Sequence, residues 1–391
     1  MTTTEHWAVD TQQARRLRAR MVTTLVHAGD LVDTRWQDVF AAVPRHVLVP
    51  YYYRPDNYQK VDGTTARDYD TWLRKVYSDE TLITQKTSHT VTSSGTMPGL
   101  IALMLAALDI HDEHRVLQIG TGTGYTAALL CQRLGPNNVT TVDLDTELVN
   151  TARARLSTLG YHPTVVAGNG TEGYPPHAPY DRILATCSLT HVPTAWLAQT
   201  RPDSRIVAPM AKGLFVLDVH SNEEASGRFL PTGGYFMPLR DTTNNARPHR
   251  QEPSTRNGDT RPTTLGPRET FYQQHVRFLL TVVLPEVSVG QHGPSLDDLI
   301  IQDGRGSWAR LDRSPDGAFI VPESGQRQLW AEVENVHQQW HLWNQPHRDR
   351  FGLSVTPARQ WIWLDDPTGE HTWEIFSAMA SSASCNSQTP G

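Results

Sequence analysis

The sequence predicts an α/β fold, a doubly wound and mostly parallel sheet with an additional C-terminal α+β region. Three observations predict it. Between residues 115 and 220, short β-branched strands alternate with helical stretches, as in βαβ units. A glycine-rich turn, QIGTGTGY at residues 118–125, separates the first of these strands from its helix. Residues 241–270 have almost no apolar side chains, and strand and helix patterns resume after them.

The part before residue 115 is expected to be mainly helical. Apolar residues at helical spacing predict helices over 11–29, which ends at a glycine, and over 35–42. A third helix is expected over 97–108, with Pro98 in its first turn, where proline is favoured. Between these helices, VPRHVLVP at 43–50 has a proline near each end and is expected to be a short extended segment.

The alternating part supplies the expected sheet and its helices. The expected strands are RVLQI (115–119), NVTTVDL (138–144), HPTVVAG (162–168), YDRILATCS (180–188), RIVAPM (205–210) and GLFVLDVH (213–220). The expected helices are TAALLCQRL (126–134), TELVNTARARLSTLG (146–160) and TAWLAQT (194–200). Residues 1–240 are therefore expected to form one domain.

The remaining chain is expected to form a linker and an accessory domain. Residues 241–270 are interpreted as a linker or long loop, and residues 271–391 as the accessory domain. In it, FLLTVVLPEV (278–287) is strand-like, LWAEVENVHQQWHLW (329–343) is helical, and RFGLSVTP with RQWIWLDD (350–366) alternates like a hairpin, before a frayed tail at 381–391. Its seven tryptophans are expected to form a small core, with a peptide-binding groove as the alternative.

Composition excludes several function classes. The net charge is −6 and there is no basic run, so nucleic-acid binding is not expected. The most apolar stretches are too short to cross a bilayer, and the polar start MTTTEHWAVD does not resemble a signal peptide. The three cysteines have no CxxC spacing, and no metal site is expected. These features indicate a soluble, cytoplasmic protein.

The glycine-rich turn is the clearest candidate site. A glycine-rich strand-to-helix turn brings backbone N–H groups and the positive end of a helix to a ligand. The next strand ends in Asp143, about twenty residues on, where a carboxylate can accept hydrogen bonds from ribose hydroxyls. An aromatic residue at the sixth position and no final glycine fit S-adenosylmethionine better than NAD. The alternative is a packing turn without a ligand. The expected cofactor contacts here are Gly120, Thr121, Gly122, Thr123, Gly124, Tyr125, Asp143 and Leu144.

These segments resemble protein-L-isoaspartate (D-aspartate) O-methyltransferases. The resemblance includes VLQIGTGTGYTAALL, VTTVDLDTELVNTARARL and VVAGNGTEGYPPHAPYDRILATCSLTHVPTAWLAQ, with VFAAVPRHVLVP and TVTSSGTMPGLIALML upstream and GGYFMPLR downstream. It covers roughly residues 20–240 and implies a Rossmann-like fold that binds S-adenosylmethionine. The C-terminal region is foreign to the housekeeping repair enzymes. It looks like an actinobacterial branch that accompanies ribosomally made peptides of the graspetide or imiditide type and ATP-grasp ligases.

The resemblance also implies individual site residues. The family's serine-any-proline segment, whose hydroxyl contacts the substrate carboxylate, corresponds to Thr96, Met97 and Pro98. Thr96 is therefore the expected catalytic residue, with an N-cap of the next helix as the alternative role. Substrate contacts are expected from Ser93, Ser94, Thr96, Pro98 and His191. Asn169, with Gly170, replaces the acid that contacts the adenine amine, and Gln118 replaces the acid near the methionine amino group.

The resemblance implies methyl transfer to a carboxylate, and three functions remain open. The first is a methyltransferase that esterifies an aspartate of a precursor peptide, with an ATP-grasp ligase acting in the same pathway. Its ester can close to a succinimide (aspartimide). The second is an isoaspartate O-methyltransferase that repairs damaged proteins. The third is a scaffold that binds S-adenosylmethionine without turnover, since positions 96 and 118 depart from the family's pattern.

Overall fold

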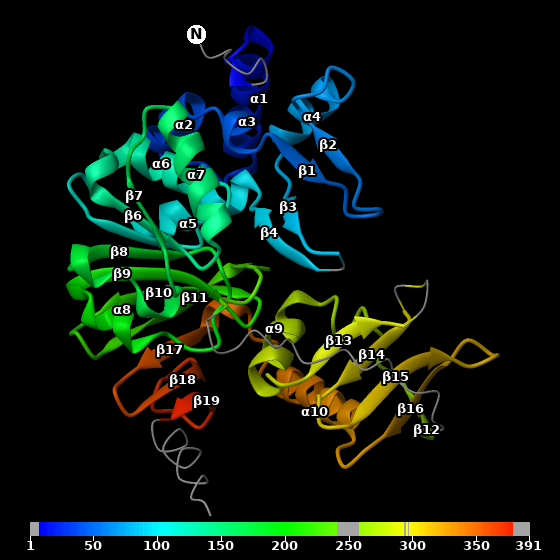
Figure 1. Ribbon diagram of the computed structural model, residues 1–391. Helices are drawn as coiled ribbons and strands as arrows, with labels where there is room; N and C mark the ends of the chain where they lie inside the picture. The colour runs from blue at the N-terminus through cyan, green and yellow to red at the C-terminus, as the bar shows by residue number, and fades with distance from the viewer. Residues whose placement is uncertain (1–7, 89, 241–257, 293–294, 296, 378–391) are drawn as a thin grey trace, which may run out of the picture.

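The largest unit is a ten-stranded sheet (Figure 1). The computed structural model describes residues 8–377 except 89, 241–257, 293–294 and 296. The strand order is β19-β18-β17-β11-β10-β9-β8-β5-β6-β7. The parallel strands are β5 (Val116–Ile119), β6 (Val139–Asp143), β7 (Thr164–Ala167), β8 (Tyr180–Ala185) and β9 (Thr200–Met210). This half of the sheet confirms the predicted βαβ core.

The other half of the sheet is antiparallel. It contains β10 (Gly213–Val219), β11 (Ala225–Gly233), β17 (Phe351–Val355), β18 (Arg359–Leu364) and β19 (Thr372–Ser377). The hairpin predicted near 350–366 is present as β17 and β18. On its other side, β17 also pairs with β11 of the main sheet. Residues 351–377 therefore complete the main sheet, so the structure does not separate 271–391 as one accessory domain.

The chain changes direction within the sheet at β5. The path from β5 to β6 and β7 moves toward one edge, whereas β8 returns to the other side of β5 and continues to β9. In open α/β sheets, ligands bind beyond the carboxyl ends of the strands at this switch point. The topology thus marks the ends of β5 and β8 as the place for a site.

Helices cover both faces of the parallel strands, and a small sheet lies beside them. The helices are α1 (Gln12–Ala28), α2 (Thr34–Ala42), α3 (Arg45–Leu48), α4 (Tyr69–Val76), α5 (Pro98–Leu108), α6 (Tyr125–Leu134), α7 (Thr146–Thr158) and α8 (Thr194–Ala198). The antiparallel small sheet, of order β2-β1-β3-β4, contains β1 (Tyr51–Tyr53), β2 (Lys60–Asp62), β3 (Leu82–Lys86) and β4 (Val91–Gly95). No helix in the described ranges is long and apolar enough to cross a membrane.

Two hydrophobic clusters lie on the two faces of the main sheet. Val116 and Leu117 are neighbours in β5, yet they belong to different clusters, because successive side chains of a strand point to opposite faces. All four residues of β5 are buried. This explains why the strand is continuously apolar except for Gln118.

A C-terminal module occupies residues 259–342. Its five-stranded antiparallel sheet has the order β12-β16-β15-β14-β13, and Figure 1 shows α9 between this sheet and the main sheet. The elements are β12 (Asp259–Thr263), α9 (Gln274–Val283), β13 (Ser288–Gln291), β14 (Leu299–Gln302), β15 (Trp308–Arg313), β16 (Phe319–Ser324) and α10 (Leu329–Leu342). Of the module's tryptophans, Trp330 and Trp340 are buried in its core.

Three local predictions are corrected. Part of the expected strand FLLTVVLPEV is helix α9, because the Gln273 side chain accepts from the N–H groups of His275 and Val276 and caps it. A fully apolar run has no periodicity that separates strand from helix. VPRHVLVP contains helix α3 instead of an extended segment. In the expected linker, residues 259–263 form strand β12; residues 241–257 and the tail at 381–391 lie outside the described residues.

Candidate active site

The glycine-rich turn lies at the switch point. Gly120, Gly122 and Gly124 have φ values of +93°, +50° and +88°, in the left-handed region that favours glycine. A Cβ on Gly120 would lie 2.7 Å from Thr186 Oγ1. The Thr186 hydroxyl, just after β8, donates to the Gly120 carbonyl at 2.9 Å. The bare backbone at Gly120 therefore lets the ends of β5 and β8 approach closely.

Asp143 ties the next strand to this turn. Its carboxylate accepts hydrogen bonds from the backbone N–H of Gly122 at 3.0 Å and of Asp145 at 3.2 Å. Burial raises the pKa of the Asp143 carboxyl, and these N–H groups and the charge of Arg240 oppose that rise. The structure thus brings together the two features that the sequence singled out, the glycine-rich turn and the acid.

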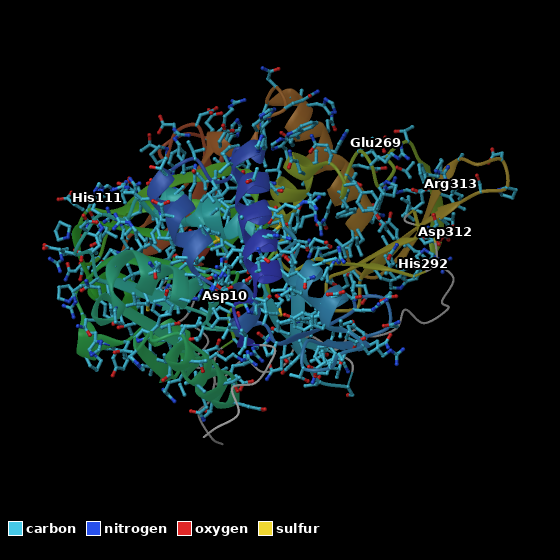
Figure 2. The ribbon with its side chains drawn as sticks, turned by 90° about the horizontal axis from the view of Figure 1, so that it is seen from above. Asp10, His111, Glu269, His292, Asp312 and Arg313 are labelled. Atoms are coloured by element: carbon cyan, nitrogen blue, oxygen red, sulfur yellow. The ribbon has the colours of Figure 1, made fainter. Side chains whose placement is uncertain are left out.

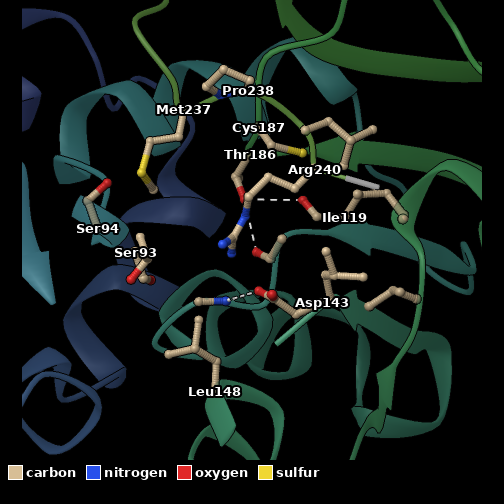
Figure 3. Close-up of a pocket in the computed structure, with 17 residues that line it drawn as sticks. Ser93, Ser94, Ile119, Asp143, Leu148, Thr186, Cys187, Met237, Pro238 and Arg240 are labelled. Atoms are coloured by element: carbon tan, nitrogen blue, oxygen red, sulfur yellow. Dashed lines mark hydrogen bonds between the residues drawn. The ribbon is translucent and has the colours of Figure 1, made fainter. Parts of the chain in front are cut away.

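A cleft of about 630 Å³ opens beside the turn (Figure 3). Its walls come from β4, the ends of β5, β6 and β8, and the segment 237–240. Among the predicted residues, its lining includes Ser93, Ser94, Gly120, Gly122, Asp143, Leu144 and Gly170.

A smaller recess adjoins the cleft, and the two share Ser94, Gly120, Gly122 and Thr186. Of the predicted residues, the recess is also lined by Thr96, Thr121, Thr123 and Tyr125. Thr96 is not the cap of α5: Met97 occupies that position, and the Asp79 carboxylate accepts from the Gly99 N–H of the first turn at 2.7 Å. The proposed capping role of Thr96 is therefore wrong.

The buried side chain of Arg45 is hydrogen-bonded to the backbone at Thr96. Its guanidinium is fully buried and donates to the carbonyls of Val76 at 2.7 Å and Thr96 at 3.1 Å. Burial lowers the pKa of Arg45. The backbone at Thr96 is thus anchored to a side chain that cannot move into solvent, which suits a residue that orients a ligand.

Four predicted residues lie outside both linings: Pro98, Gly124, Asn169 and His191. The side-chain amide oxygen of Asn169, Oδ1, already accepts hydrogen bonds from the Thr171 N–H at 3.1 Å and from the Thr171 hydroxyl at 2.9 Å. Both lone pairs are therefore engaged. His191 is half-buried in a loop whose next residue, Val192, is paired with Gln360 of β18. The geometry gives no support to substrate contact by His191.

Sequence reasoning missed part of the cleft. Thr186 and Cys187 follow β8, and residues 237–240 form a further wall. Figure 3 shows the Arg240 side chain directed into the cleft. The position of Thr186 and Cys187 after a parallel strand was a usable signal, since switch-point ligands lie beyond carboxyl ends. For residues 237–240, the family-like segment GGYFMPLR was the signal. Burial raises the pKa of the Cys187 thiol, which disfavours the thiolate form that a nucleophile requires.

Gln118 has an acceptor without a partner. Its Nε2 donates to the Gly120 carbonyl at 2.9 Å, whereas its buried Oε1 accepts no hydrogen bond from the described residues. A buried acceptor left in this state costs about 1–3 kcal/mol. No group of three or more histidine, cysteine or acidic side chains in the described part of the chain could hold a metal ion.

Comparisons with known proteins agree with this geometry. The family model of protein-L-isoaspartate(D-aspartate) O-methyltransferase (PCMT) matches residues 16–241. The protein-L-isoaspartate O-methyltransferase of Methanopyrus kandleri is 34% identical over 206 residues, 52% of this chain and 80% of that protein. That of Methanocella arvoryzae is 35% identical over 202 residues, 50% of this chain and 94% of that protein.

The fold likeness extends further than the sequence likeness. A solved protein-L-isoaspartate O-methyltransferase superposes with a TM-score of 0.53 at 19% identity and covers 89% of this chain and 100% of that chain. Residues 16–241 are little more than half of this chain, so the likeness must reach into the C-terminal region. Part of the C-terminal region therefore has a counterpart in the fold of that solved protein.

Proposed function

The chain belongs to the protein-L-isoaspartate(D-aspartate) O-methyltransferase family, and we propose on that premise that it methylates the free carboxyl group of isoaspartyl residues in peptide chains. It is a carboxyl O-methyltransferase that uses S-adenosylmethionine. One observation carries the proposal: the cleft beside Asp143 and the recess that holds Thr96 share the wall formed by Gly120 and Gly122. A cofactor and a carboxylate can therefore meet there.

The residues of the cleft fit S-adenosylmethionine. Asp143 offers a half-buried carboxylate to ribose hydroxyls, and Leu144 and Gly170 line the same cleft. The bare backbone of Gly122 leaves room beside the turn, since a Cβ there would meet only Ser93 Oγ, at 3.8 Å. We assign cofactor binding to this turn, Asp143, Leu144 and Gly170.

The protein's part in the reaction is alignment and exclusion of water. When bound, S-adenosylmethionine supplies an electrophilic methyl group; carboxylate is already ionised at neutral pH, so no general base is required. Correct alignment alone corresponds to about 7–11 kcal/mol of barrier. We assign the orientation of the substrate carboxylate to the Thr96 hydroxyl, Arg45 to positioning of Thr96, and Ser93 and Ser94 to the adjoining wall.

A matched pair of peptides tests the proposal. A short peptide with one isoaspartate and the same peptide with aspartate are incubated with the full chain and S-adenosylmethionine. The isoaspartyl peptide is expected to gain 14 mass units and the aspartyl peptide to remain unchanged. If neither peptide is methylated although calorimetry shows cofactor binding, the proposed substrate is wrong.

A narrower substrate is the second candidate: one aspartate of a ribosomally synthesised precursor peptide, whose ester closes to a succinimide. The observation in its favour is the five-stranded module at 259–342, which lies outside the part that the family model matches. A carboxylate pocket alone cannot tell one aspartate from another, so such selectivity requires contacts remote from the reacting atom. An ATP-grasp ligase would then modify the same peptide.

The two candidates make opposite predictions for ordinary aspartate. Methylation of many unrelated isoaspartyl peptides supports the first. A gain of 14 mass units, or a loss of 18 after ring closure, at a single ordinary aspartate of an acidic precursor encoded by a neighbouring gene supports the second. Methylation of both classes with equal efficiency contradicts the second, because its selectivity would be absent.

A further inference from the structure

A third cavity, which we name the junction groove, lies where the C-terminal module meets the main sheet. Its volume is about 840 Å³. The buried side chains of Phe271, Leu280, Leu284 and Val333 contribute to its walls, together with Lys212 and Arg277. Lys212 lies in the turn between β9 and β10, and Arg277 lies on α9. The groove therefore combines apolar surface with two cations from different parts of the chain.

These two cations have no carboxylate partner. No acidic side chain among the described residues lies within ion-pair distance of Lys212 or Arg277, although both are half-buried. Burial, and then the charge of Arg277, hold the pKa of Lys212 below its usual range. Arg277 instead lies over the Tyr235 ring, 4.8 Å from its centroid. Two like charges in one groove leave a positive site within a chain whose net charge is −6.

Two acidic residues of the module, Glu286 and Asp312, are already paired. Glu286, in the loop between α9 and β13, forms an ion pair with Arg327. Asp312 binds Arg310 at 2.7 Å and lies 3.4 Å from His292. Figure 2 shows His292 and Asp312 together on the module. The counter-charge for the groove is therefore not supplied by these carboxylates.

One side of the groove is formed by an end strand. Val287, Ser288 and Val289 line it, and β13 (Ser288–Gln291) pairs only with β14 in the described sheet. Val289 is 41% exposed and adds apolar surface to this side of the groove. An end strand leaves alternate backbone N–H and C=O groups without partners, and an extended peptide can pair with them.

The groove and the active-site cleft are connected by a short segment. The Gly234 N–H donates to the Lys212 carbonyl at 3.0 Å, and Tyr235 lies under Arg277. Two residues further on, Met237 lines the cleft and its carbonyl accepts from the Ser188 N–H at 2.8 Å. Two residues span at most about 7 Å of chain. A peptide in the groove can therefore place a nearby residue at the cleft.

We propose that the junction groove binds an extended, acidic segment of the peptide substrate, with carboxylates at Lys212 and Arg277, aliphatic side chains on the apolar floor and backbone against β13. This inference rests on the proposed function in one respect only: the segment belongs to the peptide that carries the methylated carboxyl. It locates the remote contacts that a selective enzyme requires, and it gives a role to the module.

A binding experiment that involves no methylation tests the proposal. A fluorescein-labelled twelve-residue peptide of alternating Glu and Val, without aspartate, is titrated with the full chain and followed by fluorescence anisotropy. Binding is expected, weakening as salt rises, and a peptide with Lys in place of Glu is expected to bind at least about tenfold more weakly. Equal affinity for the two peptides would overturn the proposal.

Variants locate the binding. Lys212→Glu/Arg277→Glu is expected to reduce affinity for the Glu-Val peptide at least about tenfold, and Lys212→Met/Arg277→Met does so with less risk to folding. The matched control is Arg268→Glu/Arg305→Glu, which makes the same change of charge at two exposed arginines outside the groove lining. Loss of affinity in the control as large as in the groove variants would overturn the groove as the binding place. So would unchanged affinity in both groove variants.

A proline-containing peptide tests the proposed backbone contact with β13. Proline in place of each Val removes N–H donors and is expected to weaken binding about tenfold. Equal binding would overturn the contact with β13. Failure of the proposed function stays distinguishable, because it would appear as absent methylation of short isoaspartyl peptides by the wild-type chain, whereas the Glu-Val peptide reports the groove alone.

Discussion

The two halves of the ten-stranded sheet are built in different ways. In the parallel half, β5, β6 and β7 follow one another in sequence. The site there depends on the backbone of Gly120 and Gly122 and on the Asp143 carboxylate that binds the Gly122 N–H. In the antiparallel half, β11 pairs with β17 from more than a hundred residues away. Side chains join these distant segments. Fully buried Arg348 donates to the carbonyls of Pro231 and Gln274, each at 3.0 Å.

Because the two halves are built differently, substitutions in them should have different effects. A backbone-built site tolerates few changes at its glycines, because a side chain would occupy the space that the ligand or a neighbouring strand requires. Where a buried side chain joins distant segments, removing it lowers the free energy of unfolding, because the carbonyls that it bonded lose their donors. Substitutions in the parallel half should therefore change binding and rate, whereas those in the antiparallel half should change the free energy of unfolding.

The largest effect is expected for Arg348→Ala. The substitution empties the space of a fully buried side chain and removes the donors of two part-buried carbonyls, so the free energy of unfolding should fall by about 3–5 kcal/mol. The control is Arg228→Ala: exposed Arg228 also donates to two carbonyls, those of Arg350 and Asp365 at 3.1 Å. It should cost less than about 1 kcal/mol, because water replaces its bonds. Equal losses in urea denaturation would contradict the distinction.

The next effect concerns the glycine turn. Gly120→Ala adds a Cβ 2.7 Å from Thr186 Oγ1 at a φ of +93°, so affinity for S-adenosylmethionine should fall about 100-fold, or roughly 2.7 kcal/mol. Gly135 also has positive φ, +79°, but no atom lies within 4 Å of the place that an added methyl group would occupy. Gly135→Ala should therefore lower stability and leave cofactor affinity unchanged by calorimetry. Loss of affinity in both variants would indicate a general effect of backbone strain.

Asp143→Ala should weaken cofactor binding by roughly 1.5–3 kcal/mol, the contribution of hydrogen bonds to a charged acceptor. The control is Asp145→Ala two residues on. Asp145 caps α7 by accepting from Glu147 and Leu148, and it lies outside the cleft lining. Its loss should cost about 1 kcal/mol of stability and little affinity. Undiminished affinity in Asp143→Ala would remove Asp143 from the site.

The smallest effect is expected at Thr96. Thr96→Ala should lower kcat for an isoaspartyl peptide about tenfold, the lower end of what one hydrogen bond to a charged group contributes. Affinity for S-adenosylmethionine should stay the same, and Thr96→Ser should retain most of the rate because it keeps the hydroxyl. Since Thr96 does not cap α5, stability should change little. An unchanged kcat in Thr96→Ala would show that the hydroxyl does not contact the substrate.

The sequence by itself determined the parallel half of the sheet and the centre of the site. The alternation of strands and helices, the turn at 120–124 and the acid at 143 are local patterns, and local patterns report backbone geometry that neighbours in sequence create. The ends of β5 and β6 meet because both strands are parallel neighbours, so Asp143 could be placed beside the turn from the sequence alone.

Only the tertiary structure decided where the C-terminal strands pair, which apolar run is helix, and which distant residues complete the cleft. The run FLLTVV has no period, so α9 depends on its cap by Gln273 and its burial between two sheets. The pairing of β17 with β11 depends on buried contacts such as Arg348 with Pro231. Likewise, Arg240 reaches the cleft because Leu239 and Ser188 pair their backbones. Contacts between residues far apart in sequence leave no periodic trace, because each depends on the folded position of its partner.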